Sequence, residues 1–391
     1  MKFIEPVEIT AEYKITTPMF LGGAFPAESI DSQQFRNASL KGALRFWWRA
    51  LNWGKQLQSC QGDEAAALRV LHEREATLFG LASDAQHSAQ SRVQLSSALE
   101  QAHTLPAGDR SLKPSSYLLG MGLYDYKVGI IRPCLTDGAL TIRARFKLSA
   151  SSSEVSEVRQ ALTALGVLGG LGSRARKGLG SLSIQRIRDT QIQEFATRQD
   201  IQHFIDSLDY SAPSLTAPLT ALGQGARIDI CPGKHSPLAC LQQISQCIQL
   251  YRDGTVQGME RESNFKQDRS LAAEAAKGKP IASLPQRAVF GLPHNYFWID
   301  SKAKLDIAPD ESTRNRRASP LFIHIHQFPD GQCSIIHTLL PSLFLPTGSR
   351  IKLSGKGTTT LENPKVDFGV ITRYMDRFTR ENKGEVLRHG Q

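Results

Sequence analysis

A glycine-rich basic segment, Gly166–Ser181 (GVLGGLGSRARKGLGS), constrains this chain more than any other feature of its sequence. It holds six glycines, and the stretch from Val158 to Arg188 contains six basic and no acidic residues. Glycine admits positive φ and lets backbone N–H groups approach a ligand closely, while nearby cations neutralise phosphates. The simpler reading is a flexible tight connection, but cations among small residues favour a polyanion site. Those cations are Arg174, Arg176 and Lys177.

The segment is not a nucleotide-binding P-loop. It lacks the GxxxxGKS or GxxxxGKT pattern. It also joins a predicted helix over 154–168 to a predicted strand over 179–187, whereas a P-loop joins a strand to a helix. The positive charge of the segment is therefore interpreted as a site for the phosphate backbone of a nucleic acid.

The first half of the chain alternates predicted strands and helices. Apolar and polar residues alternate over 6–16, which is typical of a half-buried strand. Leaving aside an insertion over 54–90, the order is strand–helix–strand–strand–helix–strand, the ferredoxin-like arrangement of RNA-recognition modules. The remaining elements are expected at 39–53, 92–97 and 140–149.

The second half predicts another domain. Residues 211–218 are rich in Ser, Thr and Pro and form a candidate linker. Residues 253–280 are polar and charged, so we expect a mobile insertion there. We predict an α+β protein with an N-terminal ferredoxin-like domain over 1–190 and a degenerate second copy over 220–391. Elements of that copy are expected at 226–230 and 237–251, in a hairpin over 321–327 and 333–339, and at 367–378.

The helix expected from Ser39, its candidate N-cap, carries an apolar face and a cationic ridge. Trp47 and Trp48 lie on the apolar face, at the i, i+3, i+4, i+7 spacing of a buried stripe, and are interpreted as core. Phe46 lies off that stripe and is a candidate for stacking on a base. The ridge, Lys41, Arg45 and Arg49, repeats every four residues. Such like charges repel, and a phosphate backbone or an acidic partner would relieve that cost; the alternative is a solvated face.

The overall charge agrees with a polyanionic partner. Lysine and arginine number 47 against 37 acidic residues, a net charge of +10. The six cysteines form no CxxC pair, so we expect a reduced cytoplasmic protein without disulfides or zinc. The N-terminus lacks a signal pattern and no run of about 18 apolar residues exists, so no membrane partner is expected.

No pattern indicates hydrolysis, since neither GxSxG nor HExxH occurs. His72, His87 or His103 could act as a general acid in metal-independent RNA cleavage. His324 and His326 would share one strand face, but a metal site needs further ligands, so a core or partner contact is favoured. No cofactor is expected. A basic cluster, Arg314, Arg316 and Arg317, precedes this strand and is a further candidate RNA contact or a surface cluster.

Three motifs in order, TPMFLGGA (17–24), SLKGALRFWWRAL (39–51) and GGLGSRARKGLGSL (169–182), resemble the RAMP superfamily of CRISPR proteins. RNRRASPLFIHI (314–325) adds to the resemblance. The likeness is greatest to the first-numbered Cmr subunit family of type III-B effectors. It implies two ferredoxin-like (RRM-like) RAMP domains packed together, in a complex with guide RNA, target RNA and other RAMP subunits.

The resemblance implies a non-catalytic role, the capture of target RNA near the 3′ side of the guide RNA. It implies RNA contacts at Lys41, Arg45, Arg49, Arg174, Arg176 and Lys177, with the backbone shaped by Gly22, Gly23, Gly170 and Gly172. Two alternatives stay open. One is a RAMP endoribonuclease that processes CRISPR RNA, and the other is a structural cap whose basic faces contact acidic subunits.

Overall fold

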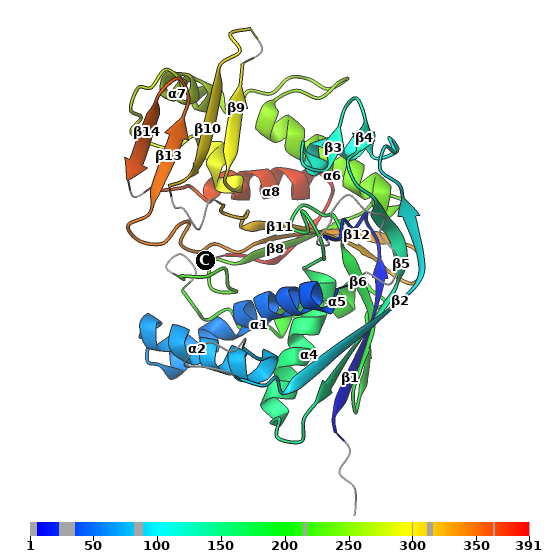
Figure 1. The fold of residues 1–391 in the computed structure, drawn as a ribbon. Helices are drawn as coiled ribbons and strands as arrows, with labels where there is room; N and C mark the ends of the chain where they lie inside the picture. Colours follow the sequence, from blue (N-terminus) through cyan, green and yellow to red (C-terminus); the bar gives the residue numbers. More distant parts are fainter. Residues whose placement is uncertain are drawn as a thin grey trace, which may run out of the picture.

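The computed structural model describes residues 6–22, 36–81, 89–213, 217–298, 300–310, 316–362 and 364–390. Within these residues the chain is a mixed α/β protein with antiparallel sheets (Figure 1). Two of the sheets carry helices on one face, and a third sheet lies at the far end of the second half.

The first sheet is built by the N-terminal half and has the order β2-β5-β1-β6-β7. The four strands expected for a ferredoxin-like arrangement are β1, β2, β5 and β6, in chain order. In the sheet, β1 lies between β5 and β6, and β2 lies on the outer side of β5. Helices α1 and α4 pack together, and α4 lies on β1 and β6. The elements are β1 (Glu8–Ile15), α1 (Asn37–Ser59), α2 (Glu64–Phe79), β2 (Val93–Leu105), β5 (Cys134–Phe146), α4 (Ser152–Val167), β6 (Leu182–Arg188) and β7 (Ile192–Glu194).

Helix α1 confirms the predicted core face and corrects its boundaries. Trp47 and Trp48 are buried, as the apolar stripe predicted. The helix begins at Asn37 with Arg36 at the N-cap, so the prediction that Ser39 caps it was wrong. It also continues to Ser59, and the region expected as an insertion supplies a second helix, α2. Asp63 caps α2 by accepting a hydrogen bond from the backbone N–H of Ala66 at 3.0 Å.

The second sheet, β11-β12-β8-β15, repeats the strand order of the first. Strand β8 opens the series and is followed by α6, the β11–β12 hairpin, α8 and β15. Helices α6 and α8 both pack on this sheet. The predicted hairpin is confirmed at the bounds expected for both strands. The elements are β8 (Arg227–Pro232), α6 (Pro237–Asp253), β11 (Leu321–Gln327), β12 (Cys333–Leu339), α8 (Gly369–Glu381) and β15 (Glu385–Arg388).

The third sheet, β14-β13-β10-β9, was not predicted. It is assembled from two stretches, one between α6 and β11 and the other between β12 and α8. The region 253–280, expected as a mobile insertion, contains helix α7, which packs on this sheet through Ala272 and Ala275. The elements are α7 (Lys266–Ala276), η3 (Gln286–Phe290), β9 (His294–Phe297), β10 (Lys304–Pro309), β13 (Arg350–Ser354) and β14 (Thr358–Glu362).

Shorter elements connect these layers. A small hairpin projects near α6 and is formed by β3 (Tyr124–Asp125) and β4 (Gly129–Ile130) (Figure 1). It follows η2 (Lys113–Ser115) and α3 (Ser116–Leu119), and α5 (Arg198–Asp206) leads toward the second half. The expected linker over 211–218 lies partly outside the described residues, but the described Ala212 and Ala217 are buried.

Strand β11 joins the two halves. The backbone N–H groups of Ile325 and Gln327 donate to the Ser181 and Ser183 hydroxyls, at 3.2 and 2.8 Å. Thr16 Oγ1 donates to the carbonyl of Ile325 at 2.9 Å. These buried and partly buried hydrogen bonds tie the end of β1 and the start of β6 in the first sheet to an edge strand of the second, so the halves share a polar seam.

Two expectations about the whole chain can be compared with the structure. All six cysteines are free thiols in the structure. Among the described residues, no helix combines the length and the apolar character needed to cross a membrane.

Candidate nucleic-acid interface

The glycine-rich segment is an ordered loop between α4 and β6. Leu171 N donates to the carbonyl of Gly180 and Ser173 N to the carbonyl of Phe20, both at 2.9 Å. At Gly172 φ is +87°, and a Cβ there would lie 2.6 Å from the Phe20 oxygen. A Cβ at Gly170 would lie 2.6 Å from the Gly180 oxygen. Both positions therefore require glycine because backbone passes against backbone.

The other two predicted backbone-shaping glycines gain no such support. A Cβ at Gly22 would meet nothing within 4 Å, and its φ is not in the left-handed region. Gly23 lies outside the described residues. The TPMFLGGA motif instead contributes through Met19 and Phe20, which are buried against the glycine-rich loop and neighbouring strands.

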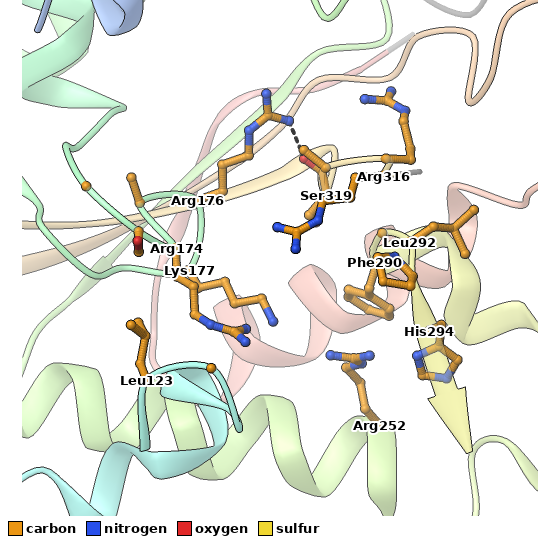
Figure 2. Close-up of a pocket in the computed structure, with 18 of the residues that line it drawn as sticks. Leu123, Arg174, Arg176, Lys177, Arg252, Phe290, Leu292, His294, Arg316 and Ser319 are labelled. Carbon is orange, nitrogen blue, oxygen red and sulfur yellow. Dashed lines mark hydrogen bonds between the residues drawn. The ribbon is translucent and has the colours of Figure 1, made fainter. Parts of the chain in front are cut away.

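The loop borders a cavity of about 990 Å³ (Figure 2). Its opposite wall comes from the end of α6, the turn leading into β9, and the segment before β11. None of the twenty described lining residues is acidic. The lining cations are Arg132, Arg174, Arg176, Lys177, Arg252, Arg316 and Arg317. The structure thus brings the loop and the predicted Arg316–Arg317 pair to one site, and Arg314 lies outside the described residues.

Three of these cations have internal hydrogen-bond partners. Arg132 donates to the Ser173 hydroxyl, Arg176 donates to the Ser319 carbonyl at 2.6 Å, and Arg317 donates to the Ser342 hydroxyl at 2.9 Å. The side chains of Arg174, Lys177, Arg252 and Arg316 have no hydrogen bond or ion pair to any described residue. The Arg252 guanidinium does lie 4.8 Å from the ring centroid of Phe290. Because none of the four has a hydrogen-bonding or ionic partner among the described residues, they will be called the free cations of the cavity.

The free cations act on one another electrostatically. Burial, together with the nearby Arg252 and Arg174, lowers the pKa of Lys177 to about 7. Burial and the charge of Arg316 lower the pKa of Arg174. Arg174 also has a φ of +59°, uncommon for a residue with a side chain and a feature of functional sites. The site concentrates positive charge without a carboxylate among its described lining residues.

Arg176 differs from its neighbours because it has a structural role. Burial and the nearby Arg317 lower its pKa to about 9. Its guanidinium lies 5.0 Å from the ring centroid of Phe46 and 4.3 Å from that of Phe322. The Phe46 ring also packs 5.6 Å from Phe322. Phe46, predicted as a candidate for base stacking, is therefore already occupied by side chains from both halves.

The cationic ridge of α1 lies apart from the cavity and has an acidic partner. Arg45 and Arg49 both pair with the buried carboxylate of Glu75 on α2, the Arg49 contact being 2.5 Å. Lys41 does not pair with Glu75, and its pKa is lowered by burial and by the nearby Arg45. None of the three ridge residues lines the cavity. The repulsion expected within the ridge is thus relieved partly by the chain itself.

Of the three histidines singled out as candidate acids, the structure describes His72 and His103. His72 is exposed on α2, and His87 lies outside the described residues. His103 is 77% exposed and pairs with Asp137 at 2.6 Å. No group of three or more metal-ligating side chains occurs among the described residues.

His324 and His326 lie in the core, as favoured from their pattern. Both are fully buried on β11. His324 Nδ1 lies 2.7 Å from the carbonyl of Gly169, and burial lowers the pKa of His324 to about 4. They belong to the seam between the halves.

Two cavity cations were missed from the sequence. Arg252 ends α6, and Arg132 precedes β5. Neither stands in a basic cluster, and each is far along the chain from the loop that it faces. Arg132 reaches the cavity through its contact with Ser173 inside the first half, and Arg252 reaches it through the packing of the two halves.

The comparisons agree with this architecture. Residues 12–183 match the sequence model of the RAMP superfamily. The match spans β1 to the first residues of β6 and includes the glycine-rich loop. No curated protein sequence matches the chain.

Solved structures resemble the chain over nearly its whole length. The crystal structure of Cmr1 from Pyrococcus furiosus in its apo form has 16% identity and a TM-score of 0.56, covering 98% of this chain and 99% of that one. A chain of the type III-B Cmr-beta complex bound to cognate target RNA has 12% identity and a TM-score of 0.51, covering 96% and 99%. A second Cmr-beta structure, with AMPPnP and in the presence of single-stranded DNA, has 12% identity and a TM-score of 0.54 at the same coverage. At these identities, the likeness shows the fold.

Proposed function

We propose that this chain is a non-catalytic, RNA-binding subunit of a type III-B CRISPR (Cmr) effector complex. Its fold resembles Cmr1 along nearly its whole length, and the similar Cmr-beta chain belongs to a complex bound to target RNA. Its partners are then guide RNA, target RNA and other RAMP subunits. Its role is to help capture target RNA near the 3′ end of the guide in antiviral defence.

The proposal includes two ferredoxin-like RAMP domains, over 1–190 and 220–391. Their support is the repeated strand order, since β2-β5-β1-β6 and β11-β12-β8-β15 place corresponding strands in corresponding positions. The third sheet is an addition to the second domain. The cavity then lies where the two domains meet, bordered by the glycine-rich loop of the first.

The single observation that carries the RNA-binding role is the cavity with seven cations and no acidic residue among its described lining. Phosphate contacts provide affinity without base specificity, so we expect little sequence preference. The primary contacts proposed are Arg174, Lys177 and Arg316. Lys41, Arg45 and Arg49 are proposed as secondary contacts, and Arg176 acts mainly by holding the loop to β11.

Binding of single-stranded RNA across a salt series tests this role. Affinity should fall with salt along a log–log slope of about −0.7 per phosphate contact. Arg174→Glu/Arg316→Glu should weaken binding at least about tenfold and flatten the slope. The matched control is Lys55→Glu/Arg69→Glu, on exposed positions of α1 and α2. Equal losses in both variants would refute the cavity as the RNA contact.

The non-catalytic part of the proposal needs its own measurement. Incubation of the purified chain with CRISPR repeat RNA in EDTA should leave the RNA intact. A discrete cut that disappears in His103→Ala would instead establish the endoribonuclease alternative. Reconstitution of the complex with the Cmr subunits of the same genome tests the partners: omission of this chain should reduce target RNA binding.

A further inference from the structure

Two of the free cysteines, Cys240 and Cys333, meet where β8 leads into α6. Cys240 lies in the first turn of α6, and Cys333 is the first residue of β12. Gly233 N donates to the carbonyl of Cys333 at 2.8 Å, and Lys234 N donates to Cys240 Sγ at 3.0 Å. Two adjacent residues thus hold both cysteines, and the two thiols are hydrogen-bonded to one another.

The close approach at this point depends on a glycine. A Cβ added to Gly233 would lie 2.7 Å from Cys333 Cβ, a distance that side chains do not tolerate. The absence of a side chain at Gly233 therefore lets β12 bring Cys333 against the segment that also contacts Cys240.

The surroundings of Cys240 favour its thiolate. The hydrogen bond from Cys333, together with the backbone N–H and the charge of Lys234, lowers the pKa of Cys240 although this thiol is fully buried. Cys333 donates that hydrogen bond, and its own pKa is raised. By contrast, burial raises the pKa of Cys134 and of Cys231 to about 12. The thiolate is the nucleophilic form of cysteine, so Cys240 is the reactive member of the pair.

Cys333 connects the pair to solvent. It lines a surface pocket of about 450 Å³ together with the cations Arg198 and Lys234. Asp330 is the one acidic residue among the described lining of this pocket. A hydrogen peroxide molecule is far smaller than the pocket, so it can reach the thiols from this side.

We propose that Cys240 and Cys333 form an oxidation-sensitive pair, which hydrogen peroxide converts to a disulfide. The Cys240 thiolate attacks one peroxide oxygen, the O–O bond breaks, and the leaving hydroxide takes up the proton that Cys240 has released. The Cys333 thiol then attacks the sulfur of the resulting sulfenic acid. The S–S bond forms, the S–O bond breaks, and hydroxide leaves with the Cys333 proton as water. The two thiols lose two electrons and two protons, and one peroxide becomes two waters. This inference is independent of the proposed function.

The disulfide closes a long loop of the second half. Residues 240–333 include α7, β9, β10 and β11. A cross-link across such a loop removes conformational freedom from the unfolded chain. It also joins the first turn of α6 covalently to β12. We therefore expect oxidation to stabilise the second half against unfolding.

Peptide mapping of the full chain is the first test. The reduced protein is treated with hydrogen peroxide, its remaining thiols are alkylated in urea, and trypsin is added. Peptide 235–252 should then be joined to peptide 318–350, two hydrogen atoms lighter than the separate pair, and dithiothreitol should separate them. Fragment ions locate the bond, because peptide 235–252 also contains Cys247. Recovery of Cys240 and Cys333 in alkylated form would overturn the proposal.

Substitution of Cys333 separates the two chemical steps. In Cys333→Ser the oxidation of Cys240 should stop at the sulfenic acid, which dimedone labels, whereas the unaltered chain should take up little label. Cys247→Ser on the same helix is the matched control and should still form the disulfide. Equal dimedone labelling of Cys333→Ser and the unaltered chain would contradict the second step. If the variant does not fold, the mapping of the unaltered chain still decides the proposal.

Thermal unfolding measures the consequence of oxidation. The oxidised chain should have a Tm at least about 5 °C above that of the reduced chain, because the closed loop is long. Cys247→Ser should show the same rise and Cys333→Ser none. A cross-link without a rise in Tm would refute the stabilising role. A rise of equal size in Cys333→Ser would refute the assignment to this pair.

Discussion

The glycine-rich loop and the α1 ridge both place three cations in a short stretch of sequence, yet their surroundings differ. Two ridge cations pair with Glu75, whose side chain is only 3% exposed. Arg174 and Lys177 in the loop face further cations and no carboxylate among the described lining residues. A cluster of positive charge therefore marks a polyanion site only when the fold leaves it uncompensated. That criterion favours the loop.

Matched neutral substitutions give the largest expected contrast between these regions. Arg174→Met/Arg316→Met should weaken single-stranded RNA binding about tenfold or more, because it removes free charges from the cavity. Arg45→Met/Arg49→Met should weaken it less than about threefold, because those charges already have a partner. Fluorescence anisotropy with one RNA measures both. A larger loss in the ridge variant would reverse the comparison.

Removal of the internal partner should make the ridge resemble the loop. Glu75→Gln removes the charge that pairs with Arg45 and Arg49, so stability should fall by about 1–3 kcal/mol. The two freed arginines should bind RNA about threefold more tightly. Urea unfolding and anisotropy measure the two effects. Glu73→Gln on exposed α2 surface is the control, and an unchanged stability of Glu75→Gln would show that the pair contributes nothing.

The unpaired charge of Lys177 in the loop should make the stability of the protein depend on pH. The pKa of Lys177 is about 7 in the folded protein and about 10.4 in an unfolded chain, so the unfolded state binds more protons between these values. Stability should therefore rise with pH from 7 toward 10. Lys177→Met should raise Tm by about 2–4 °C at pH 7, with the gain shrinking toward pH 10. A pH-independent difference in Tm would show that Lys177 has the same pKa in the folded and the unfolded chain.

Substitution of Lys41 should have the smallest effect on RNA affinity, and it tests whether the ridge contacts RNA at all. It is the one ridge residue that does not pair with Glu75. If it contacts RNA, Lys41→Met should lower the salt slope by about 0.7 and the affinity about twofold. A slope equal to that of the unaltered chain would leave the ridge as a solvated face. Lys55→Met again provides the control.

Much of the fold could be predicted because its strands alternate strongly. The strand near β1 and the β11–β12 hairpin were predicted well, since alternating apolar residues and the turn Pro329–Asp330–Gly331 define them. The third sheet was missed for the opposite reason. Strand β9 has four residues, and β10 and β13 meet only through separate insertions. Short strands paired across distant sequence carry no local periodicity.

The candidate site was predictable only on one side. The loop cations can be recognised in the sequence because they form a cluster, whereas Arg252 is a single residue at the end of a helix. Glu75, the acidic partner of the ridge, lies on α2, in the region 54–90 for which the sequence predicts only an insertion. Neither pairing nor its absence can be inferred from spacing along one segment, because both depend on which distant segments pack together.

The composite wall of the cavity has a consequence for how such proteins diversify. One side belongs to the segment that matches the family model, and the other is supplied by Arg252, by the turn into β9 and by the residues before β11. Insertions between α6 and β11 can change without disturbing the strand order of either principal sheet. Ligand preference can thus change while the scaffold stays constant, and the first half alone would offer only one wall of the cavity.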